Sequence, residues 1–104
     1  MLDFRRHYRK KTELSGTYTL DAPTNGGGRL TVVNISRSGV GFEVTGLHAI
    51  MIGQKARLQF TLDNKKKTPI DKHVVIISVK NGYVGCEFLD DRVFEKDLGF
   101  YLQP

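Results

Sequence analysis

The sequence predicts an all-β fold, a six-stranded antiparallel β-barrel followed by a short C-terminal α-helix. Three observations predict it. Apolar and polar residues alternate along several segments, which is the period of a half-buried strand. Clusters of Gly, Asn, Asp and Ser separate those segments as turns do. Near the C-terminus the apolar period changes to that of a helix. Strands of this number and spacing, joined by frequent turns, favour a small barrel.

Length and composition suit one soluble domain. The chain has 104 residues, of which 39% are hydrophobic and 26% charged, so we expect a single unit over residues 1–104. Cys86 is the only cysteine, which excludes an internal disulfide and fits a reducing, cytoplasmic location. No apolar run has the length of a membrane span, and no apolar segment follows the basic N-terminus as it would in a secretory signal.

The first half of the chain predicts a basic arm and three strands. Residues 1–11 contain a cluster of Arg and Lys without a clean period, and we expect a flexible arm there. The segment 21–28 consists almost entirely of residues that favour turns, and the segment 36–39 interrupts the strand alternation a second time. The three strands are expected at residues 13–20, from 29 to about 35, and 40–44.

The second half predicts three more strands, after a mixed connection at residues 45–54. We expect Leu47, Ile50 and Ile52 of this connection to close one end of the core. Asn81-Gly82 predicts a tight hairpin turn. The three strands are expected at residues 55–62, 73–80 and 83–89.

The barrel is therefore expected over residues 12–89 and the C-terminal helix within 90–104. Asp90 or Asp91 would cap this helix. The apolar residues at helical spacing are Phe94, Leu98, Tyr101 and Leu102.

The residues that catalysis or metal binding requires are scattered. His7, His48 and His73 show no nucleophile motif with a serine, and with one cysteine they do not form a metal-ligand pattern. The glycines 26–28 lack the Lys-Ser/Thr of a phosphate-binding loop, so a hairpin turn explains them better. We predict that the protein is not an enzyme and has no metal or cofactor.

The basic charge favours an anionic partner. The net charge is +5 and the isoelectric point about 9.5, which suits nucleic acid, nucleotides, phospholipid or an acidic protein face. The basic arm is either a solvated tail or a ligand-binding segment. In the second case Arg5 and Arg9, four residues apart, could hold a purine nucleotide, because guanidinium groups bind phosphate and the guanine edge and stack on bases.

The segment 34–41 also has two interpretations. It is either a polar turn in which Gly39 supplies a positive φ, or a recognition turn at the barrel rim. Asn34 and Ser36 have the same parity and point to one face if the strand persists. Both side chains can donate and accept hydrogen bonds, which suits recognition of a base edge.

Together the two segments resemble the paired motifs of the PilZ domain family. These motifs are Arg-x-x-x-Arg, followed by Asn/Asp-x-Ser-x-x-Gly one strand-loop-strand later. The segment 84–88, Val-Gly-Cys-Glu-Phe, is similar to the family's late Gly-x-x-Phe strand, and the resemblance covers nearly the whole sequence. The matching motif residues are Arg5 and Arg9, then Asn34, Ser36 and Gly39.

The resemblance implies a bacterial receptor for cyclic di-GMP. It implies that Arg5 and Arg9 hold phosphates and guanine edges, that Asn34 and Ser36 hydrogen-bond one guanine, and that Gly39 permits close approach. It further implies an arm that is mobile without ligand and wraps over the barrel when ligand binds. Such a domain would signal by docking on a protein partner in motility, surface-attachment or polysaccharide systems.

Some positions depart from the family pattern. Asn34 stands where many members have aspartate, and it lacks the second acceptor oxygen for guanine, which predicts lower affinity. Phe4 stands where some members carry an arginine that helps to hold a ligand dimer, which favours one ligand per domain. Arg6 is a candidate for an accessory contact with the ligand. Ser78 lies where the family often has a larger side chain that packs on a base, and serine would offer little area for that packing.

The alternative function is binding of single-stranded nucleic acid, since basic barrels with exposed aromatic rings serve that purpose. Only Tyr8 and Tyr83 are expected to be exposed, which makes nucleic acid the weaker hypothesis. A third hypothesis, an interaction scaffold that has lost its ligand, is disfavoured by the arginine arm. The aromatic residues with apolar-face parity are Tyr18, Phe42, Phe60 and Phe88.

Overall fold

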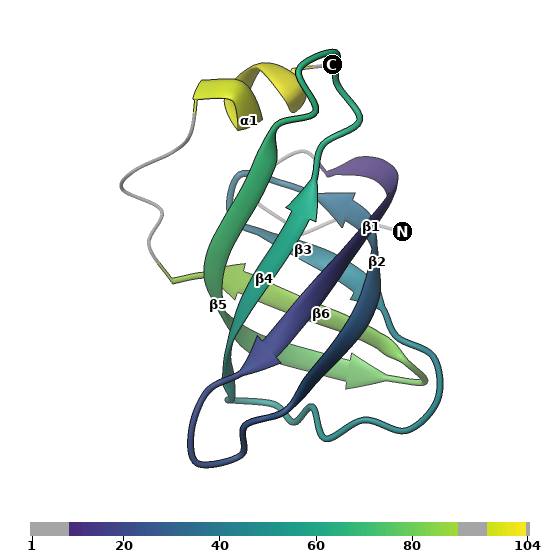
Figure 1. Ribbon diagram of the computed structural model, residues 1–104, viewed down its shortest axis with the longest axis vertical. Helices are drawn as coiled ribbons and strands as arrows, with labels where there is room; N and C mark the ends of the chain where they lie inside the picture. The colour runs from purple at the N-terminus through teal and green to yellow at the C-terminus, as the bar shows by residue number, and fades with distance from the viewer. Residues whose placement is uncertain (1–8, 90–95, 104) are drawn as a thin grey trace, which may run out of the picture.

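The computed structural model describes residues 9–89 and 96–103, which form a closed antiparallel barrel with one short helix at its upper end (Figure 1). The order of the strands around the barrel is β1-β2-β3-β6-β5-β4. This confirms the predicted fold class. The elements are β1 (Lys10–Leu20), β2 (Gly27–Ile35), β3 (Gly39–Glu43), β4 (Lys55–Thr61), β5 (Pro69–Lys80), β6 (Tyr83–Phe88) and α1 (Lys96–Tyr101).

Four strands begin earlier than the sequence pattern suggested, and the difference is largest for β1 and β5. β1 begins at Lys10, so the end of the predicted arm 1–11 already pairs with β2. β5 begins at Pro69 rather than at residue 73, because its first residues pair with β4 from Thr61 onward. Proline is tolerated as the first residue of a strand. The alternation was hard to recognise in the sequence because charged residues follow Pro69 and Ile70, and only Ile70 is buried among residues 69–73.

The inward-facing residues of all six strands form one continuous core. Phe42, Leu58 and Ile76 are among the side chains that are fully shielded from solvent. Because the sheet closes on itself, each strand has a hydrogen-bonded neighbour on both sides, although β1 pairs with β4 only from Gly16 to Leu20. Asn81 and Gly82 both have left-handed φ angles, 51° and 82°, which confirms the predicted hairpin turn between β5 and β6.

Helix α1 packs on the upper end of the core. Leu98, Tyr101 and Leu102 are buried, which confirms the predicted helical spacing for these three residues. The Tyr101 hydroxyl donates to Asp63 Oδ1 at 2.6 Å and so ties the helix to the β4–β5 connection. Phe94 and the proposed caps, Asp90 and Asp91, lie outside the described residues. Within the described ranges, no helix is long and apolar enough to cross a membrane.

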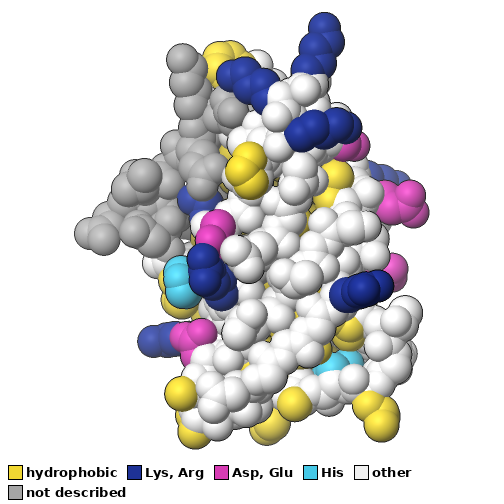
Figure 2. Space-filling model, viewed as in Figure 1, with side chains coloured by type: hydrophobic (Ala, Val, Ile, Leu, Met, Phe, Trp, Pro, Cys, Tyr) yellow, Lys and Arg dark blue, Asp and Glu magenta, His cyan; other side chains and the backbone are white. Residues whose placement is uncertain are grey.

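The β3–β4 connection covers the opposite end of the barrel and corrects one prediction. Ile50 is 5% exposed and fills the core as expected, but Leu47 is 105% and Ile52 67% exposed. Hydrogen bonds of 2.8 Å from Gly53 N to Ile76 O and from Ile76 N to Gln54 O hold the connection against β5. Only one of the three apolar side chains then points inward. Figure 2 shows hydrophobic side chains projecting at this lower end.

Three β-bulges change which face a residue occupies, because one extra residue reverses the alternation that follows it. Val32 and Ile35 are both buried although they are three residues apart, and Asn34 between them lies on the outer face. In β5, Ile76 is buried whereas Ser78 is exposed. The shifts fall between Lys11 and Leu14 in β1, between Val32 and Asn34 in β2, and between Ile76 and Ser78 in β5.

The contrast within the β3–β4 connection predicts two different mutational effects. Ile50→Ala should lower the free energy of unfolding by about 2–4 kcal/mol, because it removes buried methylene groups and leaves a cavity. Leu47→Ala should change it by less than about 0.5 kcal/mol, because Leu47 makes no core contact. Urea denaturation of both variants measures this. Equal losses in the two variants would contradict the described path of the connection.

Cys86 predicts a pH dependence of stability. The thiol is buried, donates to the Val40 carbonyl at 3.4 Å, and has its pKa raised to about 12, mainly by burial. The unfolded chain loses this proton near its ordinary pKa of 9.0, whereas the folded protein retains it. The stability is therefore complete below about pH 9 and falls as pH rises, by roughly 1.4 kcal/mol between pH 8 and pH 10.

Urea denaturation across that range, under reducing conditions, measures the slope against pH. Cys86→Ala should be less stable at every pH but should lack this part of the slope. An identical slope in the variant and the parent would show that another group is responsible.

Candidate ligand-binding site

The turn that joins β2 to β3 is held by Ser36. Its backbone N–H donates to Gly39 O at 2.8 Å. Its side-chain Oγ accepts hydrogen bonds from Ser38 N at 3.1 Å and from Gly39 N at 3.2 Å. Ser36 is only 1% exposed and is the one polar residue among the buried residues described. In this structure the hydroxyl therefore stabilises the turn from within.

Gly39 is required by close packing and not by its φ angle. It does not have the left-handed conformation that one sequence interpretation assigned to it. A Cβ at Gly39 would instead collide with the carbonyl oxygen of Cys86 on β6. Because this obstacle is backbone, it cannot move aside, and the Phe88 N–H donates to Ser38 O at 2.8 Å in the same contact. Gly39 lets the turn lie directly against β6.

Four residues form a row across the outer face of β2, β3, β6 and β5. Asn34 pairs with Gly41, Gly41 with Gly85, and Gly85 with Ser78. The two glycines make room for polar atoms, since a Cβ on Gly41 would strike the Tyr83 hydroxyl and the Asn34 amide, and a Cβ on Gly85 would lie 2.6 Å from Ser78 Oγ. We call these four residues, together with Tyr83, the polar shelf.

Arg9 reaches the polar shelf from the start of β1. Its Nη1 donates to Asn34 Oδ1 at 2.7 Å, and the Asn34 Nδ2 donates to the Tyr83 hydroxyl at 3.0 Å. Arg9 Nε is buried and has no hydrogen-bond partner among the described residues. A buried donor without a partner is costly, so the guanidinium has capacity for one more acceptor.

Lys10, the next residue, contacts helix α1. Its Nζ donates to the carbonyl oxygen of Tyr101 at 3.0 Å and lies 3.8 Å from the centre of the Tyr101 ring. Burial and the neighbouring Asp63 carboxylate raise the pKa of the Tyr101 phenol, so this residue stays neutral and keeps donating to Asp63. The base of the arm is thus in contact with both the polar shelf and the helix.

The structure brings together some of the predicted site residues. Arg9 and Asn34 are in direct contact, and Ser36 and Gly39 form the turn that follows Asn34. Ser78 lies at the far end of the same row. The condition under which Asn34 and Ser36 would share a face is not met, because β2 ends at residue 35 and the β2 bulge turns Asn34 outward. Phe4, Arg5 and Arg6, with His7 and Tyr8, lie outside the described residues.

Sequence analysis included Gly41 in the segment 34–41 and Gly85 in the late Gly-x-x-Phe strand, but it gave neither glycine, nor Tyr83, a role in this site. Glycine inside a strand often marks a place where another group approaches closely. The segments Gly39-Val40-Gly41 and Tyr83-Val84-Gly85 carry that pattern at outward positions. The glycines were therefore detectable in principle. Tyr83 was not, because its partner Asn34 is 49 residues away.

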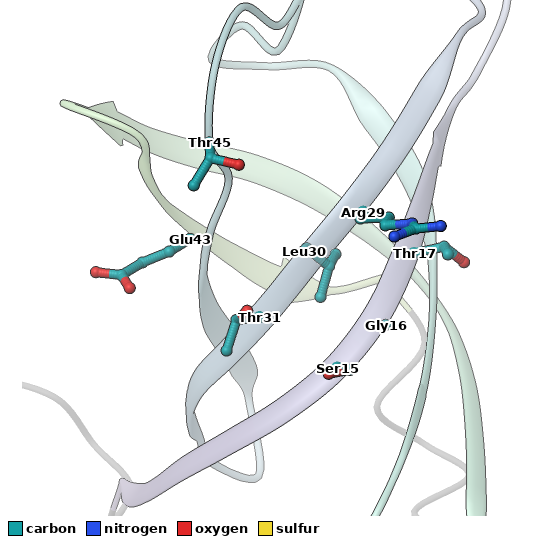
Figure 3. Close-up of a pocket in the computed structure, with 8 residues that line it drawn as sticks. All are labelled: Ser15, Gly16, Thr17, Arg29, Leu30, Thr31, Glu43 and Thr45. Atoms are coloured by element: carbon teal, nitrogen blue, oxygen red, sulfur yellow. The ribbon is translucent and has the colours of Figure 1, made fainter.

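A separate groove of about 500 Å³ runs over the outside of β1, β2 and β3 (Figure 3). Its side chains spread along the strands and do not converge on one point, and none belongs to the predicted site. Among the residues that the structure describes, no group of His, Cys, Asp and Glu could hold a metal ion. The groove is lined by Ser15, Gly16, Thr17, Arg29, Leu30, Thr31, Glu43 and Thr45.

Comparison with known proteins identifies the domain type. The profile of the PilZ domain matches residues 3–102, and the comparison with curated proteins returns no match. Among solved structures, the inhibitor of motility MotI/DgrA from Bacillus subtilis has a TM-score of 0.76 at 16% identity, covering 97% of this chain and 48% of that chain.

The PilZ domain of YcgR from Escherichia coli, solved with cyclic di-GMP, has a TM-score of 0.70 at 15% identity, covering 96% of this chain and 92% of that chain. YcgR from Escherichia coli in complex with cyclic di-GMP has a TM-score of 0.70 at 17% identity, with coverages of 98% and 44%. At these identities the likeness shows a shared fold. The chain spans about half the length of MotI/DgrA and of the longer YcgR structure.

The buried hydroxyl of Ser36 predicts a structural effect of its removal. Ser36→Ala should lower the free energy of unfolding by about 1–2 kcal/mol, because two backbone N–H groups of the turn lose their acceptor. Ser38→Ala, two residues away, should cost clearly less, because no backbone group depends on its hydroxyl among the described contacts. Urea denaturation compares the two variants. A Ser36→Ala protein as stable as the parent would show that the turn does not depend on this hydroxyl.

Proposed function

The chain belongs to the PilZ domain family, and on that premise we propose that it is a bacterial, cytoplasmic receptor for cyclic di-GMP that binds the dinucleotide at the polar shelf. The observation that carries the proposal is the contact between Arg9 and Asn34. These residues are 25 positions apart and belong to the two separate motifs, yet their side chains meet at 2.7 Å.

The chemistry of the polar shelf suits this ligand. Cyclic di-GMP carries two phosphate charges and two guanines, and the chain has a net charge of +5. Arg9 offers a guanidinium fork whose Nε still lacks a partner among the described residues, and such forks bind phosphate and guanine edges. Asn34 supplies both donor and acceptor atoms. The glycines keep the surface shallow enough for a flat base to approach.

The arm supplies the response to ligand in this proposal. Arg5, with Arg6 as an accessory, would close over the ligand together with Arg9, and Phe4 in place of a further arginine favours one ligand per domain. Lys10 follows Arg9 directly and holds α1 through Tyr101. A change in the position of Arg9 would therefore act next to the contact that holds the helix, which gives the domain a way to alter its surface for a protein partner.

The partner would belong to a motility, surface-attachment or polysaccharide system. Support for this comes from the family resemblance and from the shared fold with a protein named as an inhibitor of motility. The domain would act as a binding module and not as an enzyme. Nucleic acid is a weaker proposal, because Tyr18, Phe42, Phe60 and Phe88 are buried in the core and are not available for stacking on bases.

Calorimetric titration with cyclic di-GMP tests the proposal. The parent protein should bind one ligand per domain saturably, and Arg9→Ala should weaken binding at least about tenfold, because a charge-assisted hydrogen bond is worth roughly 1.5–3 kcal/mol. Arg29→Ala removes the same charge from the outer face of β2, away from the polar shelf, and should change the affinity little.

GMP and a short single-stranded RNA serve as ligand controls. The absence of saturable binding to cyclic di-GMP, checked by a second method, would overturn the proposed function. RNA binding with a steep salt dependence would favour the nucleic-acid alternative instead.

A further inference from the structure

Arg9 fixes the direction of the two hydrogen bonds that link it through Asn34 to Tyr83. A guanidinium group only donates, so the Asn34 atom that faces Arg9 Nη1 at 2.7 Å must be the amide oxygen. The amide nitrogen then faces the Tyr83 hydroxyl at 3.0 Å. Because an amide nitrogen only donates, Tyr83 must accept at this contact. Two successive hydrogen bonds therefore run in one direction, from Arg9 to Asn34 and from Asn34 to Tyr83, and we call this chain of hydrogen bonds the relay.

Tyr83 stands at the end of this relay with a proton to donate. Its oxygen accepts from Asn34, so its own O–H is directed elsewhere, and the described part of the chain provides no acceptor for it. The phenol is half-buried on the outer face of β6, above Gly41. A hydroxyl that accepts a hydrogen bond becomes a better donor. The shelf therefore presents a donor at Tyr83 and, on Asn34 Oδ1, a second lone pair that can accept.

This pattern of donor and acceptor matches one purine better than the other. Guanine carries the acceptor O6 beside the donor N1–H, whereas adenine carries an amino donor beside an acceptor nitrogen. A donor on the protein therefore meets an acceptor in guanine, and it meets a second donor in adenine. The cost of such a mismatch is high when polar groups are left without partners.

Resting on the proposed function, we infer that Tyr83 is a specificity-determining residue that donates its hydroxyl proton to the six-position oxygen of a bound guanine, with Asn34 Oδ1 accepting from the adjacent ring N–H. Tyr83 belongs to neither of the paired motifs, and the directions in the relay assign it this role. The inference concerns base selection and leaves charge recognition to the arginines.

Tyr83→Phe tests the inference, because it removes the hydroxyl and keeps the ring over Gly41. Affinities for cyclic di-GMP and cyclic di-AMP are measured in parallel. The variant should lose about tenfold in affinity for cyclic di-GMP and less than about twofold for cyclic di-AMP, so that its preference for guanine falls about tenfold. Tyr18→Phe, which removes a phenol hydroxyl from the core side of β1, is the matched control and should leave the preference unchanged.

Asn34→Asp provides a second test that keeps the tyrosine. A carboxylate only accepts, so it would accept a hydrogen bond from the Tyr83 hydroxyl and reverse the direction of the last hydrogen bond in the chain. In that background, Tyr83→Phe should change the guanine preference by less than about threefold.

The outcomes separate the two proposals. If the parent protein binds no cyclic di-GMP, the proposed function fails. If the parent binds cyclic di-GMP and a folded Tyr83→Phe protein keeps both its affinity and its preference, the role of Tyr83 is wrong and the proposed function stands. A loss that is equal for both dinucleotides would also overturn base selection by Tyr83, since it would indicate a general effect on the shelf.

Discussion

The register of the closed barrel is the constraint on which the polar shelf depends. Each of the six strands is hydrogen-bonded on both sides, so no strand can slip by a residue without moving its neighbours, and a slip would turn the core side chains outward. Asn34, Gly41, Gly85 and Ser78 line up because four separate strands keep this register. The core therefore sets the geometry of a surface to which it contributes no atoms.

The bulges reconcile a continuous core with a polar outer surface. In β2, the extra residue allows Val32 and Ile35 to remain inside while Asn34 faces out. In β5, a bulge turns Ser78 outward after the buried Ile76. Bulges occur often beside functional sites, where they direct a side chain. Here they act with strand glycines, which let the redirected polar groups lie flat on the barrel.

The arm and the helix meet where β1 begins. Arg9 hydrogen-bonds Asn34 on the shelf, and Lys10 holds the C-terminal turn of α1 through Tyr101. Tyr101 is in turn bonded to Asp63 in the β4–β5 connection. Three segments distant in the sequence are thus joined through two neighbouring residues. The proposed site on the shelf is therefore linked by direct contacts to the helix at the upper end of the barrel.

The sequence by itself determined the number and order of the strands, most core positions within them, the Asn81-Gly82 turn and the two motifs, because alternation, turn chemistry and motif spacing are local properties. Only the tertiary structure decided that Leu47 and Ile52 are exposed, that Gly39 serves close packing against Cys86, and that Tyr83 meets Asn34. The reason is that a bulge or a close contact depends on the partner strand. The partner strand lies far along the chain, and the short-range pattern of apolar and polar residues carries no information about it.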